Sequence, residues 1–227
     1  MSKNMKESCS FKLEHYKYCL ESAKRKGYKF LTLEEYIQNK SKVVRKEKII
    51  LMRHDIDHKL SLAMNFAEIE KSLGIQTTYF IRLHADYNPY RLENYKVIKN
   101  LTKMDHEVGL HYDAGFARLF NENAEQFFKR DGVIFENIIN KKISGISCHE
   151  PNNSKNEFTI SDKNIAKFGL KYQAYSPIFV KDMKYISDSS ARWREGCMCN
   201  FIEKETPKLY ITTHPIWWHK KSPLENY

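Results

Sequence analysis

The sequence lacks any long apolar run. Neither its first residues nor a later stretch has the uninterrupted hydrophobic segment that a signal peptide or a membrane-spanning helix needs. It also lacks internal repeats, low-complexity tracts and proline-rich linkers. With 227 residues and 41% hydrophobic content, the chain is long enough to bury one sizeable core. We therefore expect a soluble, cytoplasmic protein that folds as a single domain over residues 1–227.

The cysteines are few and scattered. They are Cys9, Cys19, Cys148, Cys197 and Cys199, an odd number that fits reduced thiols better than a disulfide framework. The last two are separated by one residue and resemble half of a metal site. Because the sequence offers no second half, a packed or solvated pair of thiols is the favoured interpretation.

The net charge is strongly positive, but the basic residues are not concentrated in one segment. The formal charge of +10 comes from 38 basic and 28 acidic residues, spread along the chain apart from a modest cluster at residues 40–48. A solvated surface explains most of it. The alternatives are an acidic or phosphate-bearing substrate, an anionic membrane surface, or nucleic acid. No zinc finger, basic recognition helix or RNA-binding aromatic signature is present, so we expect no nucleic-acid partner.

Strand-like and helical patterns alternate along the chain. Strands are predicted at residues 48–52, 77–82, 106–113, 143–150, 172–175, 184–187 and 209–213. Helical spacing separates several of them, as at Leu62, Phe66, Ile69 and Leu73. This alternation predicts an α/β fold with about seven parallel strands, closed or nearly closed into a barrel with helices outside. Residues 1–47 are expected to form an N-terminal helical extension packed on that barrel.

Polar side chains follow five of the predicted strands. They are Asp55 and Asp57, His111 and Asp113, His149, Asp188, and His214. In parallel barrels the carboxyl ends of the strands meet on one face and carry the chemistry. One such residue would usually be a cap or a satisfied polar group, but convergence at five strand ends indicates a functional site.

Aspartate and neutral histidine suit a divalent metal with open positions for water and substrate. Two aspartates two residues apart can divide the work. One binds the metal while the other acts as a base toward water, and a histidine on the opposite side protonates the departing group. This arrangement is suited to hydrolysis of an amide or an ester.

Five short motifs occur in a particular order: RHDID, DHEVGLHYD, HEP, SDSSARW and TTHP. In that order, from about Lys48 to about Trp218, the chain resembles the NodB-homology polysaccharide deacetylases, carbohydrate esterase family 4 and its relatives. The resemblance implies a distorted (β/α) barrel with a metal-dependent N- or O-deacetylase site. It implies that Asp55 is the catalytic base and His214 the general acid, and that Asp57 and His111 bind the metal.

The resemblance also assigns supporting roles. Asp188 and Trp193 match residues that line the substrate groove, and we group Arg53 with them as substrate-binding. His149 stands where the family has an arginine that tunes the catalytic aspartate. Arg53 and Glu107 are further expected to support the site from behind. His106 matches a histidine that does not bind metal and is given a structural role.

One position departs from the family pattern. The second metal-binding histidine, four residues after the first, is replaced by Gly115. The third ligand must then come from elsewhere, and the candidates in order of preference are His149, Asp113, His54 and His58. The expected cofactor is one divalent metal, with zinc the first choice because mixed Asp and His ligands suit it. His149 could instead be a histidine that is simply hydrogen-bonded in the core.

The expected activity is removal of an acetyl group from a sugar. A cytoplasmic enzyme would meet a nucleotide- or lipid-linked intermediate of surface polysaccharide assembly, and the basic charge would suit a phosphate-bearing carbohydrate. The alternative is a metal-free pseudoenzyme that binds a glycan or a partner, for which Gly115 is the main sign. The sequence predicts no oligomeric state.

Overall fold

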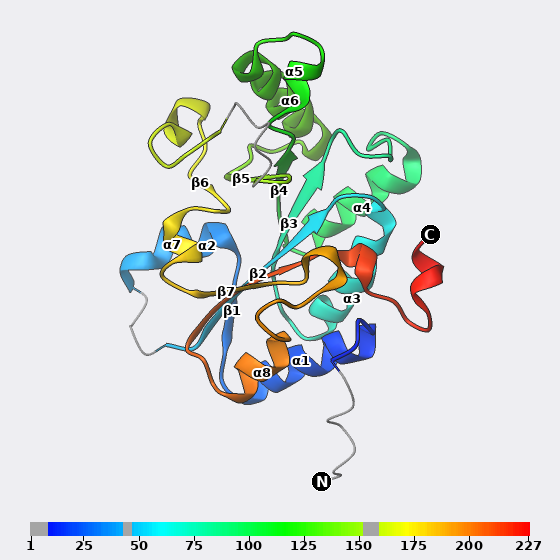
Figure 1. Ribbon diagram of the computed structural model, residues 1–227, viewed down its shortest axis with the longest axis vertical. Coiled ribbons are helices and arrows are strands. Elements are labelled where there is room, and N and C mark those ends of the chain that lie inside the picture. The colour runs from blue at the N-terminus through cyan, green and yellow to red at the C-terminus, as the bar shows by residue number, and fades with distance from the viewer. Residues whose placement is uncertain (1–8, 43–46, 152–158) are drawn as a thin grey trace.

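The computed structural model describes residues 9–42, 47–151 and 159–227; residues 43–46 of the basic cluster lie outside this part. One parallel sheet forms the centre of the molecule (Figure 1). Its strands are β1 (Lys29–Leu31), β2 (Ile49–Ile56), β3 (Thr78–Arg82), β4 (Glu107–Tyr112), β5 (Gly145–Cys148), β6 (Tyr172–Gln173), β7 (Lys184–Ser187) and β8 (Lys208–Thr213). The order is β6-β5-β4-β3-β2-β8-β7, with β1 beside the start of β2. The predicted fold class, a barrel-like parallel sheet with flanking helices, is confirmed.

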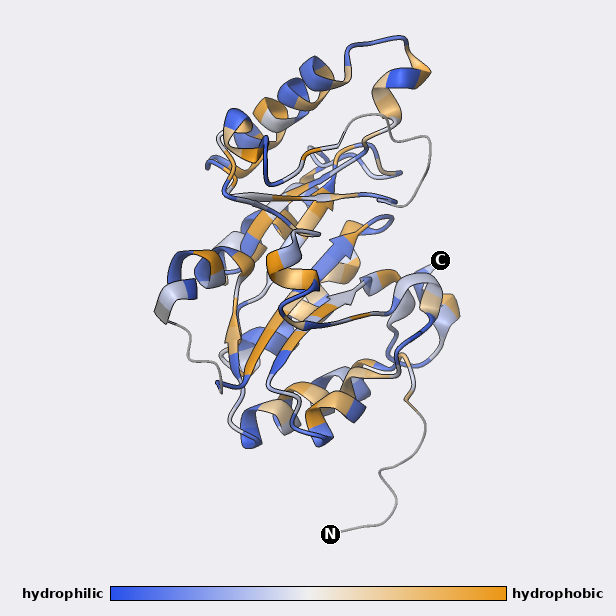
Figure 2. Ribbon diagram, turned by 60° about the vertical axis from the view of Figure 1, so that its left-hand side comes forward, coloured by the Kyte–Doolittle hydropathy of each residue, from blue (hydrophilic) through white to orange (hydrophobic). Residues whose placement is uncertain are grey.

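Helices flank the sheet, and the longer ones carry both apolar and polar residues (Figure 2). They are α1 (Leu13–Arg25), α2 (Leu33–Asn39), α3 (Ala63–Ser72), α4 (Leu92–Lys103), α5 (Phe116–Leu119), α6 (Ala124–Ile139), α7 (Pro177–Val180) and α8 (Met198–Glu203). Helix α2 begins with a capping box in which Thr32 and Glu35 exchange side-chain-to-backbone hydrogen bonds. None of the described helices is long and apolar enough to cross a membrane.

The N-terminal region contains more than the predicted helices. Strand β1 pairs with the first residues of β2, in register from Lys29 opposite Ile49. Helix α1 starts after Lys12, whose side chain makes no cap hydrogen bond within the described part of the chain. The segment before α1 instead runs beside His219, with which Lys12 forms a β-bridge. Residues 9–42 therefore add one strand to the main sheet and also form helices α1 and α2.

Strand β2 differs most from its prediction. It runs to Ile56, and all eight of its residues are buried, so Asp55 lies inside the strand rather than after it. The strand continues because its backbone pairs with β3 and β8, and its polar side chains contact buried groups such as Tyr210 and Glu70. Successive strand residues point to opposite faces. Ile50 and Met52 therefore join the core under the helices, whereas Ile49 and Leu51 join the smaller core on the other face.

Candidate active site

Asp55 is held by an arginine two residues earlier on the same face of β2. Nη2 of Arg53 lies 3.1 Å from Oδ2 of Asp55, and the arginine side chain is fully buried. Nη1 of Arg53 donates to the hydroxyl of Tyr210 (3.0 Å), and the guanidinium lies 4.3 Å from the ring centroid of Tyr175. Among the described residues, none makes a hydrogen bond to the buried Oδ1 of Asp55. One carboxylate oxygen is thus fixed and the other is available to accept a proton.

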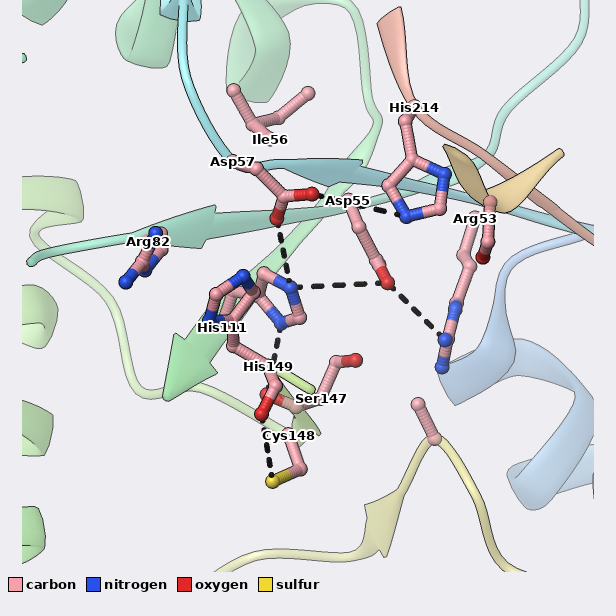
Figure 3. Close-up of polar contacts among 12 residues, drawn as sticks. Arg53, Asp55, Ile56, Asp57, Arg82, His111, Ser147, Cys148, His149 and His214 are labelled. Atoms are coloured by element: carbon pink, nitrogen blue, oxygen red, sulfur yellow. Dashed lines mark hydrogen bonds and ion pairs between the residues drawn. The ribbon is translucent and has the colours of Figure 1, made fainter. Parts of the chain in front are cut away.

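Asp57 and His111 face each other across the carboxyl end of the sheet (Figure 3). Oδ1 of Asp57 lies 3.1 Å from Nε2 of His111, and Oδ2 of Asp55 is 3.9 Å from the same nitrogen. Burial alone would raise the pKa of Asp57, but its contact with His111 holds that pKa well below its usual range. Burial would lower the pKa of His111, yet the charges of Asp55 and Asp57 raise it.

The tautomer of His111 shows what fits between these groups. Its Nδ1 lies 3.0 Å from the carbonyl oxygen of Ser147, which can only accept, so Nδ1 carries the hydrogen. In the neutral ring, Nε2 then points a lone pair at Asp57, whose Oδ1 receives no hydrogen bond from residues 9–42, 47–151 or 159–227. Two electron-rich atoms in this position are stable only with a proton or a metal cation between them. The pair Asp57 and His111 therefore fits a divalent metal.

His214 is prepared to carry a proton. Its Nδ1 donates to Oδ1 of Asp188 (2.6 Å), and Nε2 lies 3.8 Å from Oδ2 of Asp57. Burial would lower the pKa of His214, but the attraction of Asp188 outweighs this effect and raises the pKa to about 9. Asp188 also accepts from the backbone N–H of His214 and from Nε1 of Trp218 (2.7 Å). The fully buried Asp188 thus orients a charged imidazolium toward the cavity.

His149 lies next to the Asp57–His111 pair. Its ring centroid is 5.4 Å from that of His111, with the two planes nearly perpendicular. Nδ1 of His149 is 2.9 Å from Oδ1 of Asp113. Nε of Arg82 donates to both carboxylate oxygens of Asp113, at 3.1 Å to Oδ1 and 2.9 Å to Oδ2. A carboxylate that binds one ring nitrogen in this way commonly orients a metal-binding histidine through the other.

The other candidates for a third ligand are less available. Asp113 is occupied by Arg82 and His149. His54 points to the opposite face of β2, where Glu70 and Thr213 bind its two ring nitrogens. The half-exposed His58 lies at the rim. The described residues do not bring three ligand atoms within 4.8 Å of one another in this cavity, so a third protein ligand would have to approach when a metal binds.

These residues open on a cavity of about 300 Å³. Its lining residues are Asp55, Asp57, His58, His111, Cys148, His149, Glu150, Pro151, Tyr175, Ser189, Ser190, His214 and Trp217. Arg53, Asp188 and Trp193, predicted to bind substrate, are not among them. The first two are buried behind Asp55 and His214, and Trp193 stacks on Phe11 instead. No sequence pattern singled out Tyr175, which follows the two-residue strand β6.

Glu107 does not support this site, contrary to the expectation from the sequence. It lies at the amino end of β4, where it accepts hydrogen bonds from Thr78 (2.8 Å) and Tyr172 (2.6 Å). His106 has a structural position as predicted, because its Nδ1 accepts from the backbone N–H of Thr77 (3.2 Å) in the buried core. Both residues of the motif are therefore separated from the cavity by the length of the strand.

Comparison with known proteins gives a match only in structure. No family model and no curated protein matches the sequence. The chain is similar to the structure of IcaB from Ammonifex degensii, with 17% identity, 70% of this chain and 73% of that chain covered, and a TM-score of 0.52. It is also similar to the Streptococcus pyogenes deacetylase PplD in complex with acetate, with 16% identity, coverage of 75% and 76%, and a TM-score of 0.51. At these identities the likeness shows the fold alone, and in fold the predicted resemblance to polysaccharide deacetylases is confirmed.

Proposed function

We propose that the protein is a metal-dependent hydrolase that removes an N- or O-linked acetyl group from a sugar. The observation that carries the proposal is the opposed pair of Asp57 and the Nε2 lone pair of His111, 3.1 Å apart, beside a free oxygen of Asp55. An imidazole lone pair and a carboxylate directed at one point are the ligands of a catalytic divalent ion. The fold shared with a known deacetylase supports the same reaction class.

Asp57, His111 and His149 would hold the ion, and zinc suits this mixed oxygen and nitrogen set. When bound, the ion would supply Lewis-acid polarisation of the acetyl carbonyl group. Arg82 and Asp113 would act through His149 by fixing the orientation of its ring. The carboxylate at Asp57 matters most in this set, because it brings the negative charge that the histidines lack.

Two side chains of the chain would move the protons. Asp55 would accept a proton from water on its unpartnered Oδ1 while Arg53 holds Oδ2 in place. His214 would give its Nε2 proton to the leaving nitrogen or oxygen of the sugar as the bond to the acetyl carbon breaks. Water thus adds to the carbonyl carbon, and the products are acetate and a free amine or hydroxyl group. In the family pattern an arginine that tunes the catalytic aspartate stands at the position of His149. Arg53 contacts Asp55 directly, so it would take over that role here.

The cavity supports a single acetylated sugar as the reacting group. Its volume of about 300 Å³ lies at the lower end of the range for ligand pockets. Among the described residues that line it, none is lysine or arginine. The nucleotide or lipid carrier of a surface-polysaccharide intermediate, which we retain as the substrate class, would therefore extend outside the cavity. Trp217 Nε1, buried without a partner in the described part of the chain, would be free to bind the sugar.

The test measures acetate release from acetylated nucleotide sugars and short oligosaccharides, together with the metal content of the same samples. The wild type should release acetate. Removing the metal with a chelator should abolish the activity, and adding zinc should restore it. Asp57→Ala should lose both the activity and the metal of this cavity. Full activity in Asp57→Ala, or in the metal-free wild type, would refute the proposal.

A metal-free binding protein is the second candidate. It is favoured by Gly115, which leaves the cavity without the second histidine of the family motif, and by the absence of a three-ligand group there in the described residues. A protein of this kind would bind acetylated glycans with equal affinity before and after chelation and would release no acetate. Calorimetric titration of the glycan with and without zinc separates the two functions.

A further inference from the structure

A group of sulfur and nitrogen atoms lies apart from the cavity, where α1 and α8 run side by side at the bottom of Figure 1. Sγ of Cys9, Nε2 of His15, Sγ of Cys197 and Sγ of Cys199 all lie within 4.8 Å of one another. The second half that the sequence does not reveal for Cys197 and Cys199 is thus supplied by the N-terminal segment. All five cysteines are free thiols, as the sequence predicts, but three of them, scattered in sequence, lie close together in space.

The spacing within the group matches a tetrahedral metal site. The Sγ atoms of Cys9 and Cys199 are 3.5 Å apart, and Nε2 of His15 is 3.2 Å from Sγ of Cys197. Zinc–sulfur bonds of about 2.3 Å in a tetrahedron place neighbouring sulfurs about 3.8 Å apart. A disulfide would require the two sulfurs at about 2.05 Å and would leave the other two ligands unused.

Thiolate is the form of cysteine that binds metals, and a further buried thiol lies beside the group. Cys19 is fully buried behind the group, with its Sγ 3.6 Å from Nε2 of His15. Thiols alone are weak hydrogen-bonding groups, so they give little reason for four such side chains to converge.

We propose that Cys9, His15, Cys197 and Cys199 form a structural zinc site, separate from the cavity that contains Asp57 and His111. Soft thiolates with one imidazole in a tetrahedral arrangement select zinc among the common divalent ions. Four protein ligands leave no position for a substrate, so the site is structural rather than catalytic. This proposal does not depend on the deacetylase function.

The zinc would fix the segment that leads into α1 against the C-terminal part of the chain. This segment is already paired with His219, whose backbone N–H donates to the carbonyl of Phe11 (2.9 Å). Phe11 stacks on Trp193 with ring centroids 6.3 Å apart and meets the ring of Trp218 edge-on at 5.3 Å. Trp218 in turn donates to Asp188. The zinc would thus stabilise the outer end of a packed series of side chains that reaches the partner of His214.

The first experiment measures zinc in protein purified without oxygen and with a reductant. Relative to the wild type, the double variant Cys197→Ser/Cys199→Ser should lose one zinc per chain. The matched control Cys148→Ser removes a thiol outside the group and should lose none of it. Asp57→Ala should also keep this zinc, which separates the site from the proposed catalytic metal.

The second experiment needs no cysteine variant and so does not depend on its folding. In Asp57→Ala, zinc-edge X-ray absorption should show sulfur neighbours at about 2.3 Å. Cobalt in place of zinc in the same variant should give the near-ultraviolet absorption of cobalt–thiolate bonds. Zinc surrounded only by nitrogen and oxygen, a full zinc content in the double variant, or a zinc-free protein with a Cys9–Cys199 disulfide would overturn the proposal.

Discussion

Two buried histidines each point Nε2 at a carboxylate, but they do so in opposite protonation patterns. Nε2 of His54 lies 2.8 Å from Oε1 of Glu70 and donates a hydrogen to it, while Nδ1 faces the hydroxyl of Thr213. In the neutral ring of His111 the hydrogen is on Nδ1, so Nε2 faces Asp57 with a lone pair. The first pair is complete by itself. The second requires a proton or a cation.

The carboxylates differ in the same way. Glu70 is fully buried and accepts hydrogen bonds from the hydroxyls of Tyr16, Tyr79 and Thr77 as well as from His54. Burial would raise its pKa, but the attraction of His54 lowers that pKa to about 2. In the cavity, one oxygen each of Asp55 and Asp57 has no hydrogen-bond donor in the part of the chain that the structure describes. A saturated buried carboxylate stabilises a fold, whereas an unsaturated one retains the capacity to bind and to react.

The largest expected effect comes from removing the free carboxylate. Asp55→Asn should reduce turnover by about a hundred- to ten-thousand-fold, the typical contribution of a general base, while zinc stays bound. Acetate release and zinc content are measured on the same sample. Because buried Arg53 loses its counter-charge, circular dichroism must show that the variant is folded.

Asp131→Asn is the matched control for this variant. It alters another buried carboxylate that contacts a histidine, with Oδ2 2.7 Å from Nε2 of His84, but it lies outside the cavity. Its turnover should equal that of the wild type. An Asp55→Asn enzyme as active as this control would show that the free oxygen has no catalytic use.

The saturated carboxylate should show the converse behaviour. Glu70→Gln replaces an acceptor of four hydrogen bonds by an amide, so the free energy of unfolding should fall by about 3 to 5 kcal/mol. Turnover per folded molecule should remain. Urea denaturation measures the loss, with the exposed Glu93→Gln as a control that should leave the free energy of unfolding nearly unchanged.

The same variant tests the origin of acid sensitivity. Because the pKa of Glu70 is lower when folded, its charge stabilises the protein above its usual pKa of 4.5, and this stabilisation is lost as the pH falls toward about 2. Glu70→Gln should flatten the stability curve in that window. An unchanged slope would assign the acid sensitivity to other groups.

A smaller effect should appear at His214. In metal-free protein its pKa should be about 9, and Asp188→Asn should move it down toward the usual 6.5, because the attraction of Asp188 is what raises it. Nitrogen NMR of the imidazole gives this pKa directly. His214 must be protonated to act as an acid, so activity is lost as the pH rises through its pKa. This alkaline loss of activity should occur at a lower pH in the variant than in the wild type. A pKa unaffected by Asp188→Asn would contradict this account.

The smallest expected effect is a gain. Gly115→His supplies an imidazole four residues after His111 and should tighten zinc binding in the cavity by about tenfold, or about 1.4 kcal/mol. Competition with a zinc chelator measures the affinity. Gly132→His is the control, since a Cβ added there meets nothing within 4 Å and the residue lies in α6, away from the cavity lining. Equal affinities in the two variants would mean that the missing histidine is not what limits metal binding.

Much of the fold was accessible from the sequence because buried strands are apolar runs. Seven of the eight strands lie where these runs predict them. Strand β1 was missed because its three residues, Lys29–Leu31, are too few to form a pattern. The end of β2 was misplaced because Arg53, His54 and Asp55 look like loop residues until their partners are known.

The site was accessible only in part. Because parallel strands end on the same side of a sheet, the positions of the predicted strand ends indicate that four residues lie close together: Asp55, Asp57, His111 and His214. They do not show which residues lie behind them, so Arg53 and Asp188 were expected to contact substrate although both are fully buried. Nor does any local pattern connect Cys9 with Cys199. Contacts between residues far apart in sequence depend on the tertiary arrangement, which no local spacing encodes.

The pairing of β2 with β8 has a consequence for the synthesis of the protein. These strands pair from Ile49 opposite Lys208 to His54 opposite Thr213. The central strand β2 is therefore synthesised early, and its neighbour β8 is synthesised near the end of translation. Such non-local pairing slows folding, and a nascent chain exposes an unpaired apolar edge of β2 until β8 emerges from the ribosome. Because His214 directly follows β8, no partly synthesised chain can contain a complete proton-transfer site. The order of translation would thus delay any activity until the sheet has been assembled.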